Sequence, residues 1–261
     1  MLPSEYALVA NPAALTRAGL FVAEGRLVVQ RLLEDGRFRV HSIAVTASAA
    51  QPLADTFAAR PDVPVHVCDA ETLRQATGYD FHRGCLALAW RDERVIPVDE
   101  IVHGRRLLAV QGVSNPDNVG GLFRTAFAFG FDAVLLDRAA GDPLYRKAIR
   151  TSMAATLRVP FTRAANWVDT LHALRTRGHL VVALTPHPDA TPLEAYHADP
   201  ADRVVLLAGS EGHGLSRDSM DIADVRLRIP IDPRADSLNV VVATAIAMQR
   251  FGSNEHHGDT G

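Results

Sequence analysis

The chain has 261 residues, of which 48% are hydrophobic, enough apolar material for one large core or two smaller ones. Charged residues make up 22% of the chain, and no apolar run reaches the roughly 18 residues that a membrane-spanning helix needs. A formal net charge of −3 does not suggest a protein that coats nucleic acid nonspecifically, although local arginine clusters remain usable for RNA.

The start of the chain and its cysteines favour a cytoplasmic protein. Residues 1–5 lack the basic and then apolar pattern of a secretory signal. Cys68 and Cys85 form no CxxC pair, so we expect buried free thiols in a reducing compartment and no metal site. His256 and His257 lie in a polar tail, 253–261, which we expect to be disordered and solvated.

Residues 1–95 are predicted to form a small α/β domain. The first 20 residues show little periodicity and lead in as a helix or an arm. After them, apolar runs predict strands over 20–23, 40–45, 63–67 and 85–90, with helices over 25–33, 53–59 and 71–77. A charged stretch with Pro97 follows, and residues 96–106 are predicted to be a linker.

Residues 107–252 are predicted to form a second domain around a parallel sheet. Strands are expected over 107–111, 133–136, 180–184, 204–208 and 226–229, and helices over 120–129, 143–154, 166–177 and 238–250. This alternation is typical of a parallel α/β sheet that carries helices on both faces.

The first polar motif is the turn after the strand over 107–111. It holds Asn118, the glycine pair Gly120-Gly121 and, one turn into the helix, Arg124. Glycines let a ligand approach the backbone, and amide groups at a helix start bind anions. The turn therefore predicts a site for an anionic or strongly hydrogen-bonding ligand.

Two later segments have the same character. Ala208-Gly209-Ser210-Glu211-Gly212-His213-Gly214 follows one apolar strand, and Ile229-Pro230-Ile231 leads from another strand to Ser237-Leu238-Asn239-Val240. All three segments lie at carboxyl ends of predicted strands, where open parallel sheets bind ligands.

Each of these residues also has a purely structural interpretation. Asn118 or Ser237 could simply cap the helix that follows it. Arg124 could be a solvated surface charge, and Glu211 could pair with any nearby arginine. The joint occurrence of all three segments in this order makes the structural interpretations less probable.

The three segments resemble the signature motifs of the SpoU/TrmH-type RNA 2′-O-methyltransferases of the SPOUT superfamily. Motif one matches Asn118, Arg124, Thr125 and Ala126; motif two matches Gly209, Glu211, Gly212, Gly214 and Leu215; motif three matches Ile229-Pro230-Ile231 and Ser237-Leu238-Asn239-Val240. Val241 departs from the pattern, because the family often has Ser or Ala there. Segments around 21–25 and 81–84 look like the small substrate-binding domain that many relatives carry.

The resemblance implies a fold, a cofactor and a quaternary structure. It implies an α/β domain with a parallel sheet and a trefoil knot, preceded by a small α/β/α domain of the RNA-binding type. It implies S-adenosylmethionine as cofactor, RNA as partner and a homodimer with the site at the subunit interface. The cofactor-binding residues it implies are Ala208, Gly209, Glu211, Gly212, Ile229, Ile231, Ser237 and Leu238.

By the same resemblance, the catalytic residues are Arg124, Asn118, Glu211, Ser237 and Asn239. The family proposal makes Arg124 the base, but arginine stays protonated in proteins, so it could instead hold a phosphate and stabilise the developing alkoxide. Arg146, Lys147 and Arg150 are candidates for RNA phosphate contacts or for plain surface charges.

The function implied is methyl transfer to a ribose 2′-hydroxyl of rRNA or tRNA. An RNA-binding protein with an inactive methyltransferase domain is the alternative, and the intact motif residues argue against it. A dinucleotide-dependent oxidoreductase is disfavoured because no GxGxxG follows the first strand of the alternating unit, and an ordinary Rossmann-type methyltransferase is disfavoured because the glycines come late.

Overall fold

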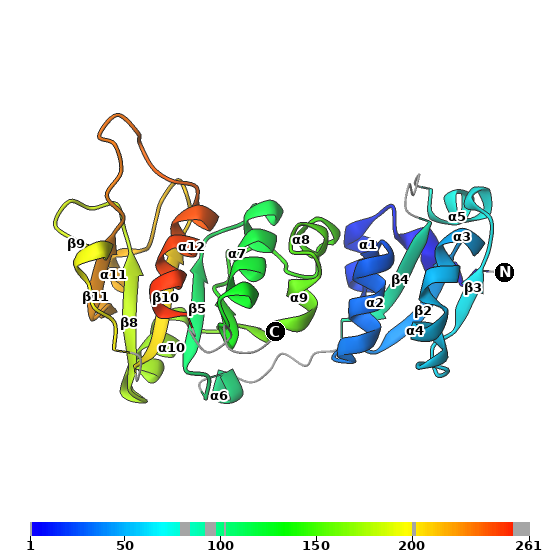
Figure 1. Ribbon diagram of the computed structural model, residues 1–261, viewed down its shortest axis with the longest axis horizontal. Coiled ribbons are helices and arrows are strands. Elements are labelled where there is room, and N and C mark those ends of the chain that lie inside the picture. The colour runs from blue at the N-terminus through cyan, green and yellow to red at the C-terminus, as the bar shows by residue number, and fades with distance from the viewer. Residues whose placement is uncertain (1, 79–83, 92–97, 102, 200–201, 253–261) are drawn as a thin grey trace, which may run out of the picture. The chain divides into compact units, whose positions relative to one another are not determined.

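The computed structural model describes residues 2–78, 84–91, 98–101, 103–199 and 202–252. Its chain divides into two compact units (Figure 1). One comprises Met1–Arg94 with Pro143–Arg158, and the other comprises Val95–Asp142 with Val159–Gly261. The domain boundaries expected from the sequence stay a prediction; residues 143–158, expected in the second domain, group with the first unit. Residues 81–83, part of the predicted linker 96–106 and the tail 253–261 lie outside the described residues.

The first unit is built on a four-stranded mixed sheet in the order β1-β4-β2-β3. Strands β1 and β2 are antiparallel to β4, and β3 is parallel to β2. The elements are β1 (Leu20–Glu24), β2 (Val40–Val45), β3 (Val65–Val67), β4 (Cys85–Trp90), α1 (Pro12–Arg17), α2 (Arg26–Asp35), α3 (Ala47–Ala50), α4 (Ala54–Ala58), α5 (Ala70–Thr77), α8 (Arg146–Thr151), α9 (Ala155–Arg158) and two 3-10 turns, Ser4–Leu8 and Gln51–Leu53.

Alternation along these strands places apolar side chains on both faces of the sheet. On one face, Val22 and Leu88 pack against Tyr6 of the 3-10 turn Ser4–Leu8. The same cluster contains Leu15 of α1 and Leu73 of α5. Helix α2 covers β1 and β4 with a buried stripe that includes Val29 and Leu32. The small α/β/α domain expected from the sequence is therefore confirmed.

The single helix predicted over 143–154 is wrong. Helix α8 ends at Thr151, because Met153 and Ala154 adopt φ values of 53° and 68° and turn the chain before α9. The amide of Ala154 donates to Ile149 O at 2.9 Å and that of Met153 to Arg150 O at 3.1 Å, which closes the helix end. Glycine normally occupies such positions, so the break has no sequence signal.

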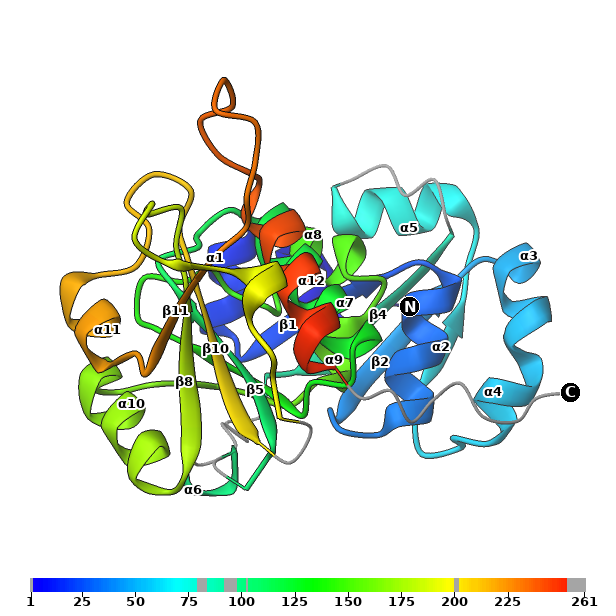
Figure 2. The same ribbon diagram turned by 60° about the vertical axis from the view of Figure 1, so that its left-hand side comes forward.

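The second unit contains a seven-stranded parallel sheet in the order β7-β6-β5-β10-β8-β11-β9 (Figures 1 and 2). Its elements are α6 (Val98–Ile101), β5 (Arg106–Gln111), α7 (Pro116–Ala128), β6 (Ala133–Leu136), β7 (Phe161–Arg163), α10 (Trp167–Thr176), β8 (His179–Leu184), β9 (Thr191–Pro192), a 3-10 turn (Leu193–Ala195), β10 (Arg203–Gly209), α11 (Arg217–Ile222), β11 (Val225–Arg228) and α12 (Val240–Phe251).

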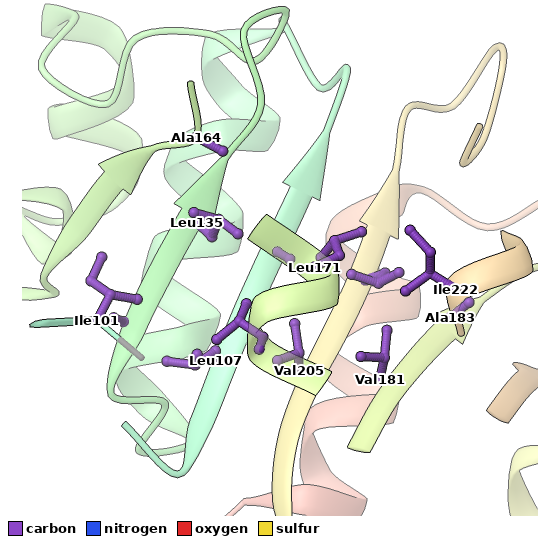
Figure 3. Close-up of a cluster of buried hydrophobic side chains, with 13 residues drawn as sticks. Ile101, Leu107, Leu135, Ala164, Leu171, Val181, Ala183, Val205 and Ile222 are labelled. Atoms are coloured by element: carbon purple, nitrogen blue, oxygen red, sulfur yellow. The ribbon is translucent and has the colours of Figure 1, made fainter. Parts of the chain in front are cut away.

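Helices cover both faces of this sheet. Figure 3 shows Leu107, Leu135, Val181 and Val205 in one buried layer, with Leu171 of α10 packed against them. Helices α7 and α12 pack side by side and contact the strands, as Figures 1 and 2 both show. The predicted parallel α/β sheet is confirmed, whereas the trefoil knot stays a prediction.

Several short elements were not predicted. Strands β7 and β9 and helix α11 are absent from the sequence-based assignment, and α7 begins at Pro116 instead of residue 120. Among the described residues, no helix combines the length and apolar character that crossing a membrane requires.

Candidate functional site

The three motif segments follow strands β5, β10 and β11 of the parallel sheet. Strand β10 lies between β5 and β8, and β11 pairs with β8, so these segments leave the sheet at its carboxyl-end edge. In Figure 1 the loop before α12, drawn in orange, stands above this edge. The topology thus brings together segments that are far apart in the sequence.

One residue from each motif meets in a hydrogen-bonded cluster, which we call the rim cluster: Asn118, Glu211 and Asn239. Asn239 Nδ2 donates to Asn118 Oδ1 at 3.1 Å and to Glu211 Oε1 at 2.6 Å. The Val240 amide also donates to Glu211 Oε1, at 3.4 Å. Glu211 therefore orients Asn118 through Asn239, instead of contacting it or Arg124 directly.

The residues that cap α7 and α12 are not those that the structural interpretations of the sequence suggested. Helix α7 is capped by Asn115, whose Oδ1 accepts from the Asp117 amide at 2.9 Å, so Asn118 lies inside the first turn. Helix α12 is capped by Asn239, whose Oδ1 accepts from the Val241 amide at 2.9 Å. The capping roles suggested for Asn118 and Ser237 are wrong, and both residues remain available for other contacts.

The motif-two loop is folded tightly on itself. The Gly214 amide donates to Ser210 O at 2.9 Å, and a Cβ atom at Gly209 would lie only 2.4 Å from Gly214 C. Any side chain at Gly209 would therefore push the loop open. A Cβ atom at Gly212 would meet nothing within 4 Å, so the fold itself does not require a glycine there.

Gln111 fixes the exit of the same loop. Its Oε1 accepts from the Ser216 amide and from Ser219 Oγ, each at 3.0 Å, and its Nε2 donates to Ser216 Oγ at 3.1 Å. Trp167 Nε1 donates to Ser219 Oγ at 2.9 Å. The end of β5 thus anchors the loop after β10.

A cavity of about 570 Å³ lies between the loops that follow β8, β10 and β11 and the start of α12. Its lining includes every residue predicted to bind the cofactor: Ala208, Gly209, Glu211, Gly212, Ile229, Ile231, Ser237 and Leu238. Glu211 alone belongs to both the cavity lining and the rim cluster. The cavity and the cluster are therefore adjacent parts of one site.

Sequence reasoning missed one wall of this cavity. The segment 184–190, which begins at the last residue of β8, contributes Thr185, His187 and Asp189, and α12 contributes Thr244. The His187 amide donates to Thr185 Oγ1 at 3.2 Å, which shapes that segment. The predicted strand over 180–184 ends at the same sheet edge, so the carboxyl-end rule that located the other loops would also have located this one.

Arg124 does not join the cluster. It lies on α7 six residues after Asn118, which is about 120° around the helix axis, and its side chain is exposed. Among the described residues it has no hydrogen-bond or ion-pair partner, and it does not line the cavity. Its neighbour Phe127 is 45% exposed on the same helix.

The residues predicted to contact RNA phosphates lie on α8, in the first unit. Arg146 Nε is 3.6 Å from Glu24 Oε2, whereas Lys147 and Arg150 are exposed. Their role in RNA binding stays a prediction.

Metal and thiol chemistry have few candidates. The described part of the chain contains no group of three or more residues that could hold a metal ion. Cys85 is buried, which raises the pKa of its thiol to about 12, and Cys68 is half-buried. A thiol that stays protonated is a poor nucleophile.

Comparisons with known proteins agree with the motifs. The model of the SpoU rRNA Methylase family matches residues 105–249. An uncharacterized tRNA/rRNA methyltransferase of Mycobacterium tuberculosis is 39% identical over 252 residues, which cover 95% of this chain and 85% of that protein. The 23S rRNA (guanosine-2′-O-)-methyltransferase RlmB of Ralstonia nicotianae is 30% identical over 184 residues, which cover 69% and 73% of the two chains.

A solved structure has the same fold over nearly the whole chain. The AdoMet-bound rRNA methyltransferase from Sinorhizobium meliloti superimposes with a TM-score of 0.78 at 25% identity, and the match covers 94% of this chain and 92% of that one. The resemblance read from the three motifs is thereby confirmed, and the chain belongs to the SpoU rRNA methylase family.

Proposed function

We propose that this protein is an S-adenosylmethionine-dependent RNA methyltransferase that modifies a ribose 2′-hydroxyl of rRNA or tRNA. The observation that carries the proposal is the rim cluster, in which one polar residue from each of three distant motifs meets beside a cavity. The 2′-O-methyltransferase activity of the Ralstonia relative and the cofactor in the Sinorhizobium structure support it.

The cavity fits the cofactor in size and chemistry. Small-molecule sites usually measure about 300–1,000 Å³ and are mostly apolar with a few polar groups. Ile229, Ile231 and Leu238 supply apolar walls for an adenine ring, and the main chain of the Gly209–Gly214 loop supplies hydrogen-bonding groups. When bound, S-adenosylmethionine supplies an electrophilic methyl group on a sulfonium.

The protein must lower the cost of removing the proton from the 2′-hydroxyl. Arginine is a poor general base because its guanidinium does not give up its proton in proteins, so we assign Arg124 to holding a phosphate and stabilising the developing alkoxide. A phosphate oxygen or water then accepts the proton. Asn118, held by Asn239 and Glu211, positions the ribose, and Ser237 adds a hydroxyl at the cavity wall.

This assignment requires a second copy of the chain, and we propose a homodimer. Arg124 lies outside the cavity of its own chain, on the exposed side of α7. Phe127 of α7 and Val242 and Ile246 of α12 are 45%, 48% and 41% exposed, on two helices that pack against each other. A partner copy on this apolar face would bury it and bring Arg124 of one chain to the cavity of the other.

The remaining roles follow the family resemblance. We propose that the first unit binds folded RNA, with Arg146, Lys147 and Arg150 as phosphate contacts, and that the chain segments around the cavity form the trefoil knot. The protein would work in the cytoplasm.

The deciding experiment is transfer of a labelled methyl group from S-adenosylmethionine to purified rRNA and tRNA, followed by mapping of the modified nucleotide. The expected product is one 2′-O-methylated ribose, and an oligonucleotide with 2′-deoxyribose at that position should accept no label. Label on a base, or no transfer to either RNA, would contradict the proposal.

The dimer has a separate test. Light scattering should give a dimer mass for the wild type and a monomer mass for the double variant Val242→Glu/Ile246→Glu, which should still bind S-adenosylhomocysteine. A monomeric wild type with full activity would overturn the dimer proposal while leaving the reaction intact.

A further inference from the structure

Thr244 of α12 is the one cavity residue whose side chain is buried and polar without a partner in the described part of the chain. Its residue exposure is 0%, it lines the cavity, and its Oγ1 atom has no hydrogen-bond partner there. Buried hydroxyl groups are nearly always hydrogen-bonded, because burying one without a partner is unfavourable. A hydroxyl without a protein partner beside a cavity is suited to bind a polar group of a ligand.

Other helical threonines of the chain show what Thr244 does not do. The hydroxyls of Thr77, Thr125, Thr170 and Thr176 each donate to the carbonyl four residues earlier, at 2.6–2.9 Å. A threonine inside a helix can satisfy its hydroxyl in this way without a partner from another element. Thr244 has Val240 four residues before it, yet its hydroxyl makes no such bond. The helix alone therefore does not account for this hydroxyl.

We infer that the Thr244 hydroxyl binds the ligand of the cavity and contacts the adenine ring of the cofactor. The inference rests on the proposed function, because the adenine belongs to the proposed cofactor. Val240 and Ala243, the other α12 residues of the lining, are apolar and suit the face of a heterocycle. A hydroxyl can donate to a ring nitrogen or accept from the exocyclic amine.

The position of Thr244 favours adenine over the amino-acid part of the cofactor. Ammonium, carboxylate and sulfonium groups need charged or hydrated surroundings. The ionisable residues of the lining are all exposed: His187, Asp189, Glu211, His213 and Arg226. Thr244 is instead fully buried, where an uncharged ring fits better.

The test compares Thr244→Val with Thr244→Ser by titration calorimetry. Valine keeps the shape but removes the hydroxyl, so the affinity for S-adenosylhomocysteine should fall between about threefold and tenfold. Serine keeps the hydroxyl and should restore most of that loss. Adenosine alone should lose affinity by the same factor in the valine variant, because the contact is to its base.

Thermal unfolding without ligand supplies an independent readout, because the substitution should lower ligand affinity without lowering stability. The valine variant should unfold at the same or a higher temperature than the wild type, because it removes a buried hydroxyl without a partner. Thr170→Val is the matched control: that hydroxyl donates to Asn166 O at 2.6 Å, so its loss should lower stability and leave ligand affinity unchanged.

The outcomes separate the two proposals. If the wild type binds S-adenosylhomocysteine but Thr244→Val binds it equally well, the inference is wrong and the proposed function stands. Lower stability of the ligand-free valine variant, or an affinity loss for S-adenosylhomocysteine without one for adenosine, would also overturn it. A wild type that binds neither compound would overturn the proposed function together with the inference.

Discussion

The rim cluster and the exposed side of α7 and α12 are two neighbouring regions with opposite organisation. Asn118, Glu211 and Asn239 are tied together by hydrogen bonds within one chain. Arg124, in contrast, has no partner among the described residues and shares its helix surface with exposed Phe127. One region is preorganised by the fold, and the other is left open by it.

This difference separates the steps that a single chain can complete from those that need a second surface. The cavity and the rim cluster need nothing from outside, so cofactor binding should be a property of the monomer. Methyl transfer should additionally require the partner copy that is proposed to cover the exposed side of α7 and α12.

Arg124→Ala should have the largest effect, and only on catalysis. Loss of a group that stabilises developing charge should reduce methyl transfer by about 100- to 10,000-fold. The affinity for S-adenosylhomocysteine should change little, because Arg124 does not line the cavity of its own chain and is assigned to the RNA phosphate, not to the cofactor. Single-turnover kinetics and calorimetry on the same preparation measure both quantities.

Arg217→Ala is a matched control, since Arg217 is a 93% exposed arginine on α11. It should leave both quantities near their wild-type values. An equal loss of cofactor affinity in Arg124→Ala would remove the distinction between the two regions.

Gly121→Ala should destabilise the contact between α7 and α12. A Cβ atom there would lie 2.8 Å from Cγ2 of Val241, whose branched side chain cannot swing away, and overpacking of this kind costs about 1–3 kcal/mol. The gain in helix propensity from glycine to alanine, about 1 kcal/mol, offsets only part of this cost. Urea unfolding measures the change.

Val241→Ala should rescue that variant. The double variant should be more stable than the sum of the two single changes predicts, because alanine at 241 makes room for the added methyl group. Strict additivity would mean that Gly121 and Val241 do not constrain each other. Packing against Gly121 would then not explain why valine occupies position 241, where the family often has a smaller residue.

Asn239 combines two roles that substitutions can separate. Asn239→Ala removes the cap of α12 and should cost about 1 kcal/mol of stability. Asn239→Ser can still cap the helix but cannot donate to both Asn118 and Glu211, so it should keep stability and lose activity. Full activity of the serine variant would show that the rim cluster does not position the ribose.

The smallest effect concerns pH. Burial lowers the pKa of His179, whose Nε2 lies 2.8 Å from Gly104 O. The His179 imidazole therefore binds a proton more readily in the unfolded chain than in the folded one. The contribution of His179 to the free energy of unfolding should be fully present above about pH 6.5 and should be lost as the pH falls below that value. Urea midpoints at pH 7.5 and 5.5 test this. The urea midpoint of His179→Gln should fall less between these two pH values than that of the wild type. His187→Gln, at an exposed histidine, should show the same fall as the wild type.

The main features of the fold could be predicted because the strands of a doubly covered sheet are continuous apolar runs. Runs such as 107–110 and 133–136 appear in the structure as β5 and β6. Helix α11 and strand β7 were missed because Arg217–Ile222 and Phe161–Arg163 are too short and polar to show a period. The break between α8 and α9 was missed because Met153 and Ala154 hold a backbone conformation typical of glycine.

The cavity residues on the motif-two and motif-three segments could be predicted because they belong to recognisable motifs. These segments also follow strands whose carboxyl ends lie at the same edge of the sheet. The 184–190 wall was missed because it has no glycine-rich signature, although it also follows a predicted strand. The position of Arg124 away from the cluster follows from helix geometry, since six residues do not return to the same side. The unpartnered hydroxyl of Thr244 depends on packing and could not be read from sequence at all.

The central position of β10 has a consequence for how the protein reaches its folded state. Val204 pairs with Arg106 and Gly209 with Gln111, so the middle of the sheet cannot be completed until a late part of the polypeptide has left the ribosome. Contacts between such distant segments slow folding. An early-terminated product would expose an unfinished strand edge, and cells expressing it should need chaperones to keep it from aggregating.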